Sequence, residues 1–336
     1  MTDTNILQSN EEHPFAPFVR ILGKGKKGSR SLTEEEAYTA MSMILDGEVE
    51  DLQLGAFLML LRVKEESPEE LCGFVRAVHE RTLAPENLKV DLDWSSYAGK
   101  RRHLPWFIFS ILLLSQAGYK TFIHGASGHT ANRLYTENFL TLLGFKPASN
   151  WKEVEEQIKQ LGFSYLSLAH ISPRLAEMIN MRNTLGLRSP VHSLSRLINP
   201  LNADTILQGI FHPPYAGLHQ EAGALLGYKT LAVIKGEGGE IERNPDNIMN
   251  VKYSQAGELK EEEWPALFER RHVKAKDLTP EYMKSVWRGD CEDEYAHSAT
   301  YSTCALALKH LDPSLTQDAA LEKAKELWHN RKRDAI

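Results

Sequence analysis

The N-terminal quarter of the chain carries apolar residues at helical spacing, and each run follows a helix-start signal. The first run follows Thr33 and Glu36, which stand at the spacing of a capping box. A second apolar helix is expected over residues 50–63. A third is expected after Ser67, because Pro68 occupies the first helical position, where proline is tolerated. The pattern therefore predicts a compact helical unit.

From about residue 90 the pattern changes to short apolar runs that alternate with amphipathic segments. The runs expected to be strands cover residues 90–93, 121–123, 163–166 and 230–234. The segments expected to be helices cover residues 107–114, 132–143 and 314–332, with a further helix start at Ser172. Strands that alternate with helices predict βαβ units. We therefore expect an α/β fold, with a small helical N-terminal domain and a larger α/β domain built on a mainly parallel central sheet.

One arginine-rich segment, residues 186–206, interrupts this alternation. We interpret it as a return of the chain to the helical unit. The expected helical domain therefore comprises residues 1–88 together with about 186–206. The expected α/β domain comprises residues 89–185 and 207–336, and it ends in a helical extension.

Length and composition place few limits on function. The 336 residues allow one large domain or two unequal ones, at about 100–200 residues per domain. No apolar run approaches the roughly 20 residues that span a bilayer, and the polar N-terminus has no signal-peptide core. We therefore expect a cytoplasmic protein without membrane contact. Three scattered cysteines, Cys72, Cys291 and Cys304, lack the pairing of a metal site and are expected to be reduced thiols.

The formal net charge is −6, yet basic residues gather in three stretches that contain no acid: residues 14–33, 94–136 and 178–203. Their basic residues are Arg20, Lys24, Lys26, Lys27, Arg30, Lys100, Arg101, Arg102, Lys120, Arg133, Arg182, Arg188 and Arg196. Local fields depend on this layout rather than on the mean charge, so the stretches favour a polyanionic partner. The plain alternative is a charged surface that serves solubility.

The turn between the first expected strand and the following helix lacks the composition of a phosphate-binding loop. Phosphate-binding enzymes place several glycines at such a turn, because backbone amides without side chains in the way can surround a phosphate. Residues 94–103 are instead bulky and basic, with Gly99 as their single glycine. We therefore expect this loop to attract phosphate through Lys100, Arg101 and Arg102 without enclosing it.

The N-terminal runs Leu32–Ala37 and Gln53–Arg62 resemble the helical domain of anthranilate phosphoribosyltransferase and the pyrimidine nucleoside phosphorylases. The resemblance continues through His124-Gly125 and Met181–Arg188, and it covers roughly residues 17–240. It implies a helical domain over an α/β domain, with dimerisation through the helices.

Three signatures of these enzymes are missing from the chain. The enzymes bind phosphoribosyl pyrophosphate with a glycine-rich loop, which corresponds here to Trp94–Gly99. Their lysine before the His-Gly pair is replaced by Ile123. Their adjacent Asp-Glu pair, which holds magnesium, corresponds to the loop 236–241, where Glu237 and Glu240 are the remaining candidate ligands. We therefore expect no metal, no cofactor and no efficient transferase, since departure of a diphosphate depends on amides and metal.

The run Tyr97–Pro105 resembles instead the YbiB-type, TrpD-like branch of this superfamily. That resemblance implies a homodimer that binds nucleic acid with little sequence preference and lacks transferase activity. The residues expected to contact DNA or RNA phosphates are Lys24, Lys26, Lys27, Arg30, Lys100, Arg101, Arg102 and His103. The residues expected in a residual cleft are Ser96, Tyr97, His124, Gly125, Asn132 and Arg182. Trp94, Tyr97 and Trp106 are candidates for base stacking, with burial in the core as the alternative.

Two further functions stay open at this point. One is an active phosphoribosyltransferase that uses magnesium and phosphoribosyl pyrophosphate on anthranilate or another aromatic acceptor, with His124, Asn132 and Arg182 around the acceptor. The other is a small-molecule sensor that keeps the cleft without its chemistry. His124 has a plain alternative as a buried turn histidine, and Arg182 as an ion-pair partner of helix acids.

Overall fold

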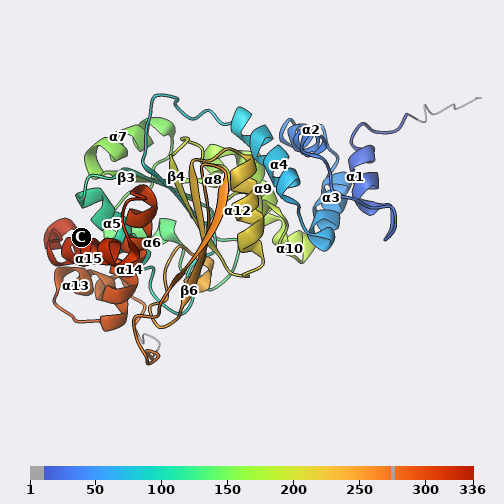
Figure 1. Ribbon diagram of the computed structural model, residues 1–336. Coiled ribbons are helices and arrows are strands. Elements are labelled where there is room, and N and C mark those ends of the chain that lie inside the picture. Colours follow the sequence, from blue (N-terminus) through green and yellow to red (C-terminus); the bar gives the residue numbers. More distant parts are fainter. Residues whose placement is uncertain (1–10, 274–276) are drawn as a thin grey trace, which may run out of the picture.

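A computed structural model describes residues 11–273 and 277–336 of the chain. A helical bundle stands at one end of the molecule, a twisted sheet lies in the middle, and C-terminal helices cover the opposite end (Figure 1). The helices of the bundle are α1 (Ala16–Gly23), α2 (Glu34–Leu45), α3 (Asp51–Lys64) and α4 (Pro68–Glu80). The expected fold class is confirmed.

The sheet has seven strands in the order β3-β2-β1-β4-β5-β6-β7. Its strands are β1 (Leu92–Ser96), β2 (Thr121–Gly125), β3 (Phe163–Ser167), β4 (Thr205–Ile210), β5 (Thr230–Lys235), β6 (Met249–Gln255) and β7 (Glu258–Trp264). The first five pair in parallel, whereas β6 and β7 are antiparallel to their neighbours. The chain therefore crosses over between parallel strands through helices and finishes the sheet with a hairpin.

Helices cover both faces of the sheet. The remaining helices are α5 (Phe107–Gln116), α6 (Thr136–Leu143), α7 (Trp151–Leu161), α8 (Leu168–Ile171), α9 (Pro173–Asn180), α10 (Arg182–Leu185), α11 (Val191–Leu194), α12 (Tyr215–Leu225), α13 (Pro280–Arg288), α14 (Glu294–Leu311) and α15 (Gln317–His329). Short 3₁₀ turns lie at Glu237–Gly239 (η1) and Arg333–Ala335 (η2).

Alternate residues of each strand enter two separate cores. Phe122 and Leu231 face a core that they share with the helical bundle and with α7, α9 and α12. Their chain neighbours Ile123 and Ala232 face a second core, which α5, α14 and α15 close. This period of two follows from the pleat of a strand that is covered on both sides.

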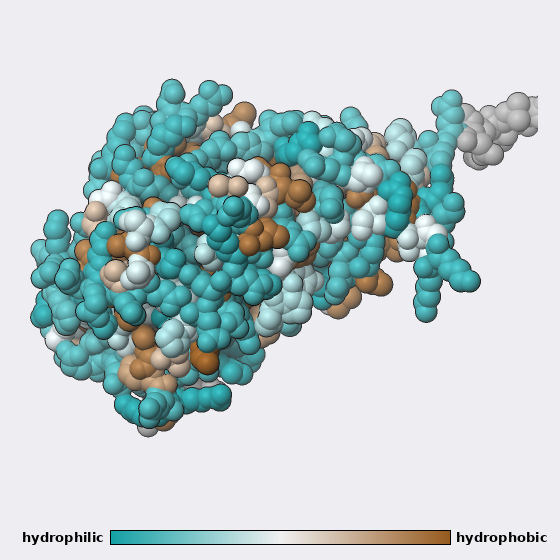
Figure 2. Space-filling view, in the orientation of Figure 1, coloured by the Kyte–Doolittle hydropathy of each residue, from teal (hydrophilic) through white to brown (hydrophobic). Residues whose placement is uncertain are grey.

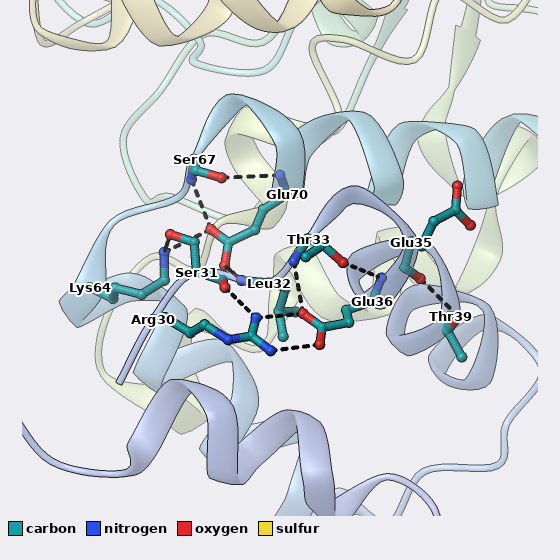
Figure 3. A network of polar contacts seen from close by, with 10 residues as sticks. All are labelled: Arg30, Ser31, Leu32, Thr33, Glu35, Glu36, Thr39, Lys64, Ser67 and Glu70. Atoms are coloured by element: carbon teal, nitrogen blue, oxygen red, sulfur yellow. Dashed lines mark hydrogen bonds and ion pairs between the residues drawn. The ribbon is translucent and has the colours of Figure 1, made fainter. Parts of the chain in front are cut away.

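The start of α2 and the start of α4 are tied into one polar network (Figure 3). The predicted capping box forms at Thr33 with Glu36, and a second one forms at the predicted helix start, at Ser67 with Glu70. The buried Glu70 carboxylate also accepts a hydrogen bond from the Leu32 amide at 2.8 Å and pairs with the Lys64 ammonium at 2.7 Å. One carboxylate thereby links two helix starts.

Helices α2 and α4 approach each other closely because Gly73 has no side chain. A Cβ atom built at Gly73 would overlap the Glu34 carbonyl oxygen and lie 2.7 Å from the Tyr38 nitrogen. The α4 helix also contacts α12 and α11, so it connects the bundle to the α/β part. Segment 186–206, expected to belong to the helical domain, contains α11, while the domain boundaries themselves stay a prediction.

The sequence places several boundaries differently from the structure. The first strand begins at Leu92 rather than residue 90, and α6 begins at Thr136 rather than residue 132. Strands β4, β6 and β7 are absent from the sequence-based expectation.

Hydrophilic residues cover most of the face shown in Figure 2, with hydrophobic residues in small groups. Over residues 11–273 and 277–336, no helix combines the length and the apolar character that crossing a bilayer requires.

Candidate anion-binding site

The loop that follows β1 still presents backbone amides as a phosphate loop does, but a carboxylate of the same chain occupies them. The amides of Ala98 and Gly99 donate to Glu240 Oε1 at 2.7 and 2.6 Å. The Ser96 hydroxyl donates to Glu240 Oε2 at 2.7 Å. Glu240 is only 1% exposed, and this burial raises the pKa of its carboxyl group. The expectation that bulky side chains remove the amide cradle is therefore wrong, since the cradle exists and holds an internal anion.

Glycines of the loop after β5 bring Glu240 into this position. Gly238 and Gly239 have φ of +71° and +92°, a left-handed conformation that favours glycine. A Cβ at Gly236 would overlap the Glu240 carbonyl oxygen, and one at Gly209 would lie 2.5 Å from the Glu240 carbonyl carbon. The glycine-rich run thus serves to turn the chain back toward β1.

A second carboxylate occupies the start of α5. The Phe107 amide, at the first residue of α5, donates to Glu242 Oε2 at 3.0 Å. The Lys100 ammonium lies 2.6 Å from Glu242 Oε1 and also pairs with Glu237. Burial raises the pKa of Glu242 to about 7 against the attraction of Lys100. Both positions where a phosphate finds amide donors near β1 are therefore filled by glutamates.

Lys100 corrects one of the sequence-based assignments. Its side chain has no exposed surface, and Glu242 and Glu237 enclose its ammonium group. Burial disfavours the charged form, yet the two carboxylates hold the pKa of Lys100 above its usual value. Lys100 is therefore a structural cation and not a contact for nucleic-acid phosphate.

Most of the expected residual cleft is interior. Both ring nitrogens of His124 are hydrogen-bonded. Nδ1 lies 2.7 Å from the Tyr97 hydroxyl, and Nε2 lies 3.1 Å from Asp93 Oδ1. All three side chains are buried. Gly125 is buried beside them, and a Cβ there would overlap the Ser96 carbonyl oxygen. Ser96, Tyr97, His124 and Gly125 therefore lie beneath the loop and do not line a cleft, and the reading of His124 as a buried histidine fits better.

The aromatic candidates for base stacking are also core residues. Trp94 stacks on Phe107 with ring centroids 5.9 Å apart, and Trp106 packs against Phe109. Neither tryptophan has exposed surface, and Tyr97 is buried as well. These positions correct the expectation of stacking, because a base needs an accessible ring face.

The two candidate magnesium ligands do not fit a metal. Glu240 is saturated by Ser96 and the amides of Ala98 and Gly99, and Glu237 pairs with Lys100. Within residues 11–273 and 277–336, no group of three or more histidine, cysteine, aspartate or glutamate side chains is arranged to hold a metal ion. Both carboxylates would have to leave these contacts to bind Mg²⁺.

Apart from the buried Lys100, the basic residues expected to contact phosphate lie in two separate segments. Lys24, Lys26 and Lys27 are exposed in the turn after α1, at the helical end of the molecule (Figure 1). Arg30 in the same segment pairs with Glu36 through two hydrogen bonds of 2.6 and 2.7 Å (Figure 3). Arg30 therefore helps to fix the start of α2, and its charge is already paired.

Arg101 and Arg102 are exposed in the loop after β1. His103 is half-buried and stacks on Tyr295 with ring centroids 4.5 Å apart. Burial lowers the pKa of His103, so it is a neutral ring at pH 7. Arg102 and His103 line a groove of about 1170 Å³. Its walls carry further cations, Lys235, Lys252 and Arg271, and also the carboxylates Glu237, Asp246 and Glu261.

Five arginines gather between the helical bundle and the α/β part, and we call them the arginine cluster. They are Arg62, Arg133, Arg182, Arg188 and Arg196. Arg182 and Arg188 both donate to the Thr130 hydroxyl, at 2.9 and 3.4 Å. Burial and the neighbouring arginines Arg182, Arg133 and Arg62 lower the pKa of Arg188. No carboxylate within the described residues lies in ion-pair distance of any of the five.

The sequence predicted this cluster only in part. Arg182 was expected in the cleft. The alternative, an ion pair of Arg182 with helix acids, is not supported, because the Arg182 guanidinium donates to the Thr130 hydroxyl. Arg133, Arg188 and Arg196 stand in the stretches that contain no acid, and this lack of acids was the sequence signal for unpaired arginines. Arg62 lies outside those stretches, on α3, and only the fold brings it near. Asn132 is exposed beside the cluster with φ of +56°.

Known proteins resemble this chain in sequence and in fold. Residues 18–82 match the glycosyl transferase family, helical bundle domain. An uncharacterized protein of Aquifex aeolicus is 31% identical over 246 residues, which cover 72% of this chain and 73% of that protein. The uncharacterized protein YbiB of Escherichia coli is 25% identical over 272 residues, 80% and 83% of the two chains. Anthranilate phosphoribosyltransferase (TrpD) from Thermus thermophilus has the same fold, with a TM-score of 0.74, 21% identity and 94% of each chain covered.

Proposed function

Because this chain belongs to the YbiB/TrpD-like branch of the glycosyltransferase family 3 superfamily, we propose that it binds DNA or RNA through phosphate contacts with little sequence preference. The observation that carries the proposal is the arginine cluster. Its guanidinium groups lie together without a carboxylate partner among the described residues, and Arg188 is half-buried. Backbone phosphates supply the missing negative charge and match the planar donor pattern of arginine.

The arginine cluster and the groove lined by Arg102 and Lys235 meet at the loop after β1. The Arg133 guanidinium donates to the Gly99 carbonyl at 3.0 Å. The same guanidinium would lie 3.9 Å from a Cβ at Gly238, a residue that lines the groove. Cations therefore stand on both sides of this loop, and carboxylates also line the groove. Several cations at separate positions favour a polymer with one charge per nucleotide over a single small anion.

The groove adds an apolar contact for bases. Phe211 lines it and is 54% exposed, whereas the tryptophans of the β1 loop are buried. An exposed aromatic side chain between cations is the arrangement that single-stranded nucleic acid uses for stacking. Phe211 therefore replaces Trp94 and Trp106 as the stacking candidate.

Fluorescence anisotropy with labelled single-stranded DNA and RNA of unrelated sequences tests the proposal. We expect similar affinity for all sequences and a logarithm of affinity that falls linearly with the logarithm of salt concentration. Replacing Arg102 or Arg188 with glutamine should reduce that slope by about one unit each. The matched control is Lys159→Gln, which removes one exposed, ion-paired cation on α7. Affinity that does not respond to salt would exclude the proposal.

The transferase alternative has less support from this geometry. A diphosphate would have to displace Glu240 from the loop amides and Glu242 from the start of α5, and the loop offers no set of metal ligands. We therefore propose that the protein acts without metal or cofactor. A coupled assay with phosphoribosyl pyrophosphate, Mg²⁺ and a panel of aromatic acceptors tests this. Turnover that disappears in Arg182→Gln would reverse the ranking.

We also propose that the protein is a cytoplasmic homodimer that associates through its helical bundle. Leu52 and Val63 on α3 are 89% and 81% exposed, although large apolar side chains normally avoid water. A second copy of the bundle would cover them. Size-exclusion chromatography with light scattering should give twice the mass of one chain, and Leu52→Lys with Val63→Lys should give the monomer.

A further inference from the structure

The geometry points to a binding site for one terminal phosphate group, a phosphate monoester, in the cavity that Arg62, Arg188 and Arg196 line. The cavity lies between α3, the segment that contains α11, and the start of α12. Where the monoester belongs to a nucleic-acid end, the inference rests on the proposed function. Where it belongs to a free sugar phosphate, the inference stands without it.

The size of the cavity selects a small group. It measures about 120 Å³, below the roughly 300–1,000 Å³ of pockets that enclose whole organic ligands. The groove lined by Arg102 and Lys235 is about ten times larger, at about 1170 Å³. A tetrahedral oxyanion therefore suits the cavity, while the rest of its molecule extends outward.

The three arginines have donors left over for such a group. Arg62 uses one nitrogen on the Tyr215 hydroxyl at 2.9 Å. Arg196 donates to the Gly209 carbonyl at 3.0 Å and to a second backbone carbonyl of its own segment. Arg188 makes one hydrogen bond, to Thr130 at 3.4 Å. A guanidinium group has five N–H donors, so each arginine can bind an oxyanion without breaking a contact.

Two buried polar atoms on the cavity wall also lack partners within the described part of the chain. They are Glu66 Oε2 and His192 Nε2, and both residues line the cavity. Buried polar atoms are nearly always hydrogen-bonded, so two unpaired atoms on different segments that line the same cavity indicate a missing ligand. Burial raises the pKa of Glu66, which favours its neutral, proton-donating form beside an anion.

Charge distinguishes a terminal phosphate from an internal one. A monoester carries about two negative charges at neutral pH, whereas a phosphodiester carries one. The repulsion among Arg188, Arg182 and Arg62 is relieved more by the doubly charged group. The cavity should therefore prefer the end of a nucleic-acid strand to its interior.

The experiment compares one oligonucleotide with and without a 5′-phosphate, at fixed salt, by fluorescence anisotropy. The wild-type protein should bind the phosphorylated strand about tenfold more tightly, and Arg188→Gln should bind both strands alike. Arg62→Gln, on the exposed surface of α3, should reduce the preference as well, and it covers the case in which Arg188→Gln does not fold. Lys159→Gln should keep the full preference.

A second arm uses ribose 5-phosphate and ribose in a thermal-shift titration. Stabilisation by ribose 5-phosphate alone, lost in Arg62→Gln, supports the site with a free sugar phosphate as its ligand. If no oligonucleotide binds in either form, the proposed function fails, and this arm alone decides the inference. Equal affinity for both strands together with no response to ribose 5-phosphate overturns the inference, even if salt-dependent binding persists.

Discussion

The ammonium nitrogen of Lys100 lies 2.6 Å from Glu242 Oε1, and neither side chain has exposed surface. Because Glu242 also accepts the hydrogen bond of the Phe107 amide, the pair fixes the β1 loop, the start of α5 and the loop after β5 to one another. A basic residue inside a basic stretch is thus part of the interior. Its neighbours Arg101 and Arg102 remain at the surface.

Replacing Lys100 with methionine should destabilise the fold without weakening nucleic-acid binding. Removal of the ammonium group leaves the mostly buried Glu237 carboxylate without a counter-charge and takes a hydrogen-bond donor from Glu242, which typically costs about 3–5 kcal/mol of unfolding free energy. Urea unfolding measures the loss, and anisotropy at a temperature where the variant is folded measures binding. A Lys100→Met protein that is as stable as the wild type but binds nucleic acid weakly would show that Lys100 contacts phosphate after all.

The stability of the wild-type protein should depend on the protonation of Glu242. Burial raises the pKa of this carboxyl group to about 7 from an ordinary 4.5, so the folded state holds the proton more tightly than the unfolded state does. The resulting stabilisation is complete below about pH 4.5 and is lost as the pH rises through about 7, a difference on the order of 3 kcal/mol.

Glu242→Gln stays uncharged and lacks this dependence. The free energy of unfolding of the variant, measured against the wild type from pH 5 to 8, should therefore shift in favour of the variant as the pH rises. A difference that stays constant over this range would contradict the assignment.

Replacing Glu240 with alanine should open the amide cradle of the β1 loop. Three donors, the amides of Ala98 and Gly99 and the Ser96 hydroxyl, lose their acceptor, which should cost about 2–4 kcal/mol. Inorganic phosphate should then raise the melting temperature of the variant more than that of the wild type, because it takes the place of the carboxylate.

The exposed Glu258 provides the control for this substitution. Among the described residues, the surface carboxylate of Glu258 pairs with Lys260 and with no other cation. Glu258→Gln should therefore change neither the stability nor the response to phosphate. Equal phosphate responses in Glu240→Ala and wild type would show that the carboxylate does not stand in for an anion.

Two helix glycines should respond to alanine with opposite signs. Gly73→Ala places a methyl group against the Glu34 carbonyl and the Tyr38 nitrogen, which should destabilise the protein by about 2 kcal/mol or more. Gly55→Ala on α3 meets only Leu185 at an ordinary 3.7 Å, and it should stabilise by up to about 1 kcal/mol. Thermal unfolding of both variants gives the comparison. Stabilisation by both would refute the close packing of α2 on α4.

Local sequence signals predicted the starts of α2 and α4 correctly. The capping boxes at Thr33 and Ser67 involve residues three positions apart, so the printed order of residues contains the whole interaction. The parallel strands β2 and β5 were also predictable, because residues 121–123 and 230–234 are continuous apolar runs of the kind that a doubly covered sheet requires, whereas the parallel strand β4 was missed.

Interactions between distant positions could not be predicted in this way. Glu240 stands 142 positions from Ala98, and no local pattern associates its carboxylate with the amide of Ala98. Arg62 and Arg188 come together only because the bundle packs on the α/β part. The acidic run that forms β7 gives no strand signal, since this exposed edge strand carries no apolar alternation.

The edge strand β7 gives one margin of the sheet a row of carboxylates. Glu258, Glu261, Glu262 and Glu263 all belong to β7, which pairs with β6 alone, while the arginines gather beyond β5 toward the bundle. Charged side chains on an edge strand disfavour pairing with the edge of another sheet, so these carboxylates keep the open margin of one copy from joining that of a second copy.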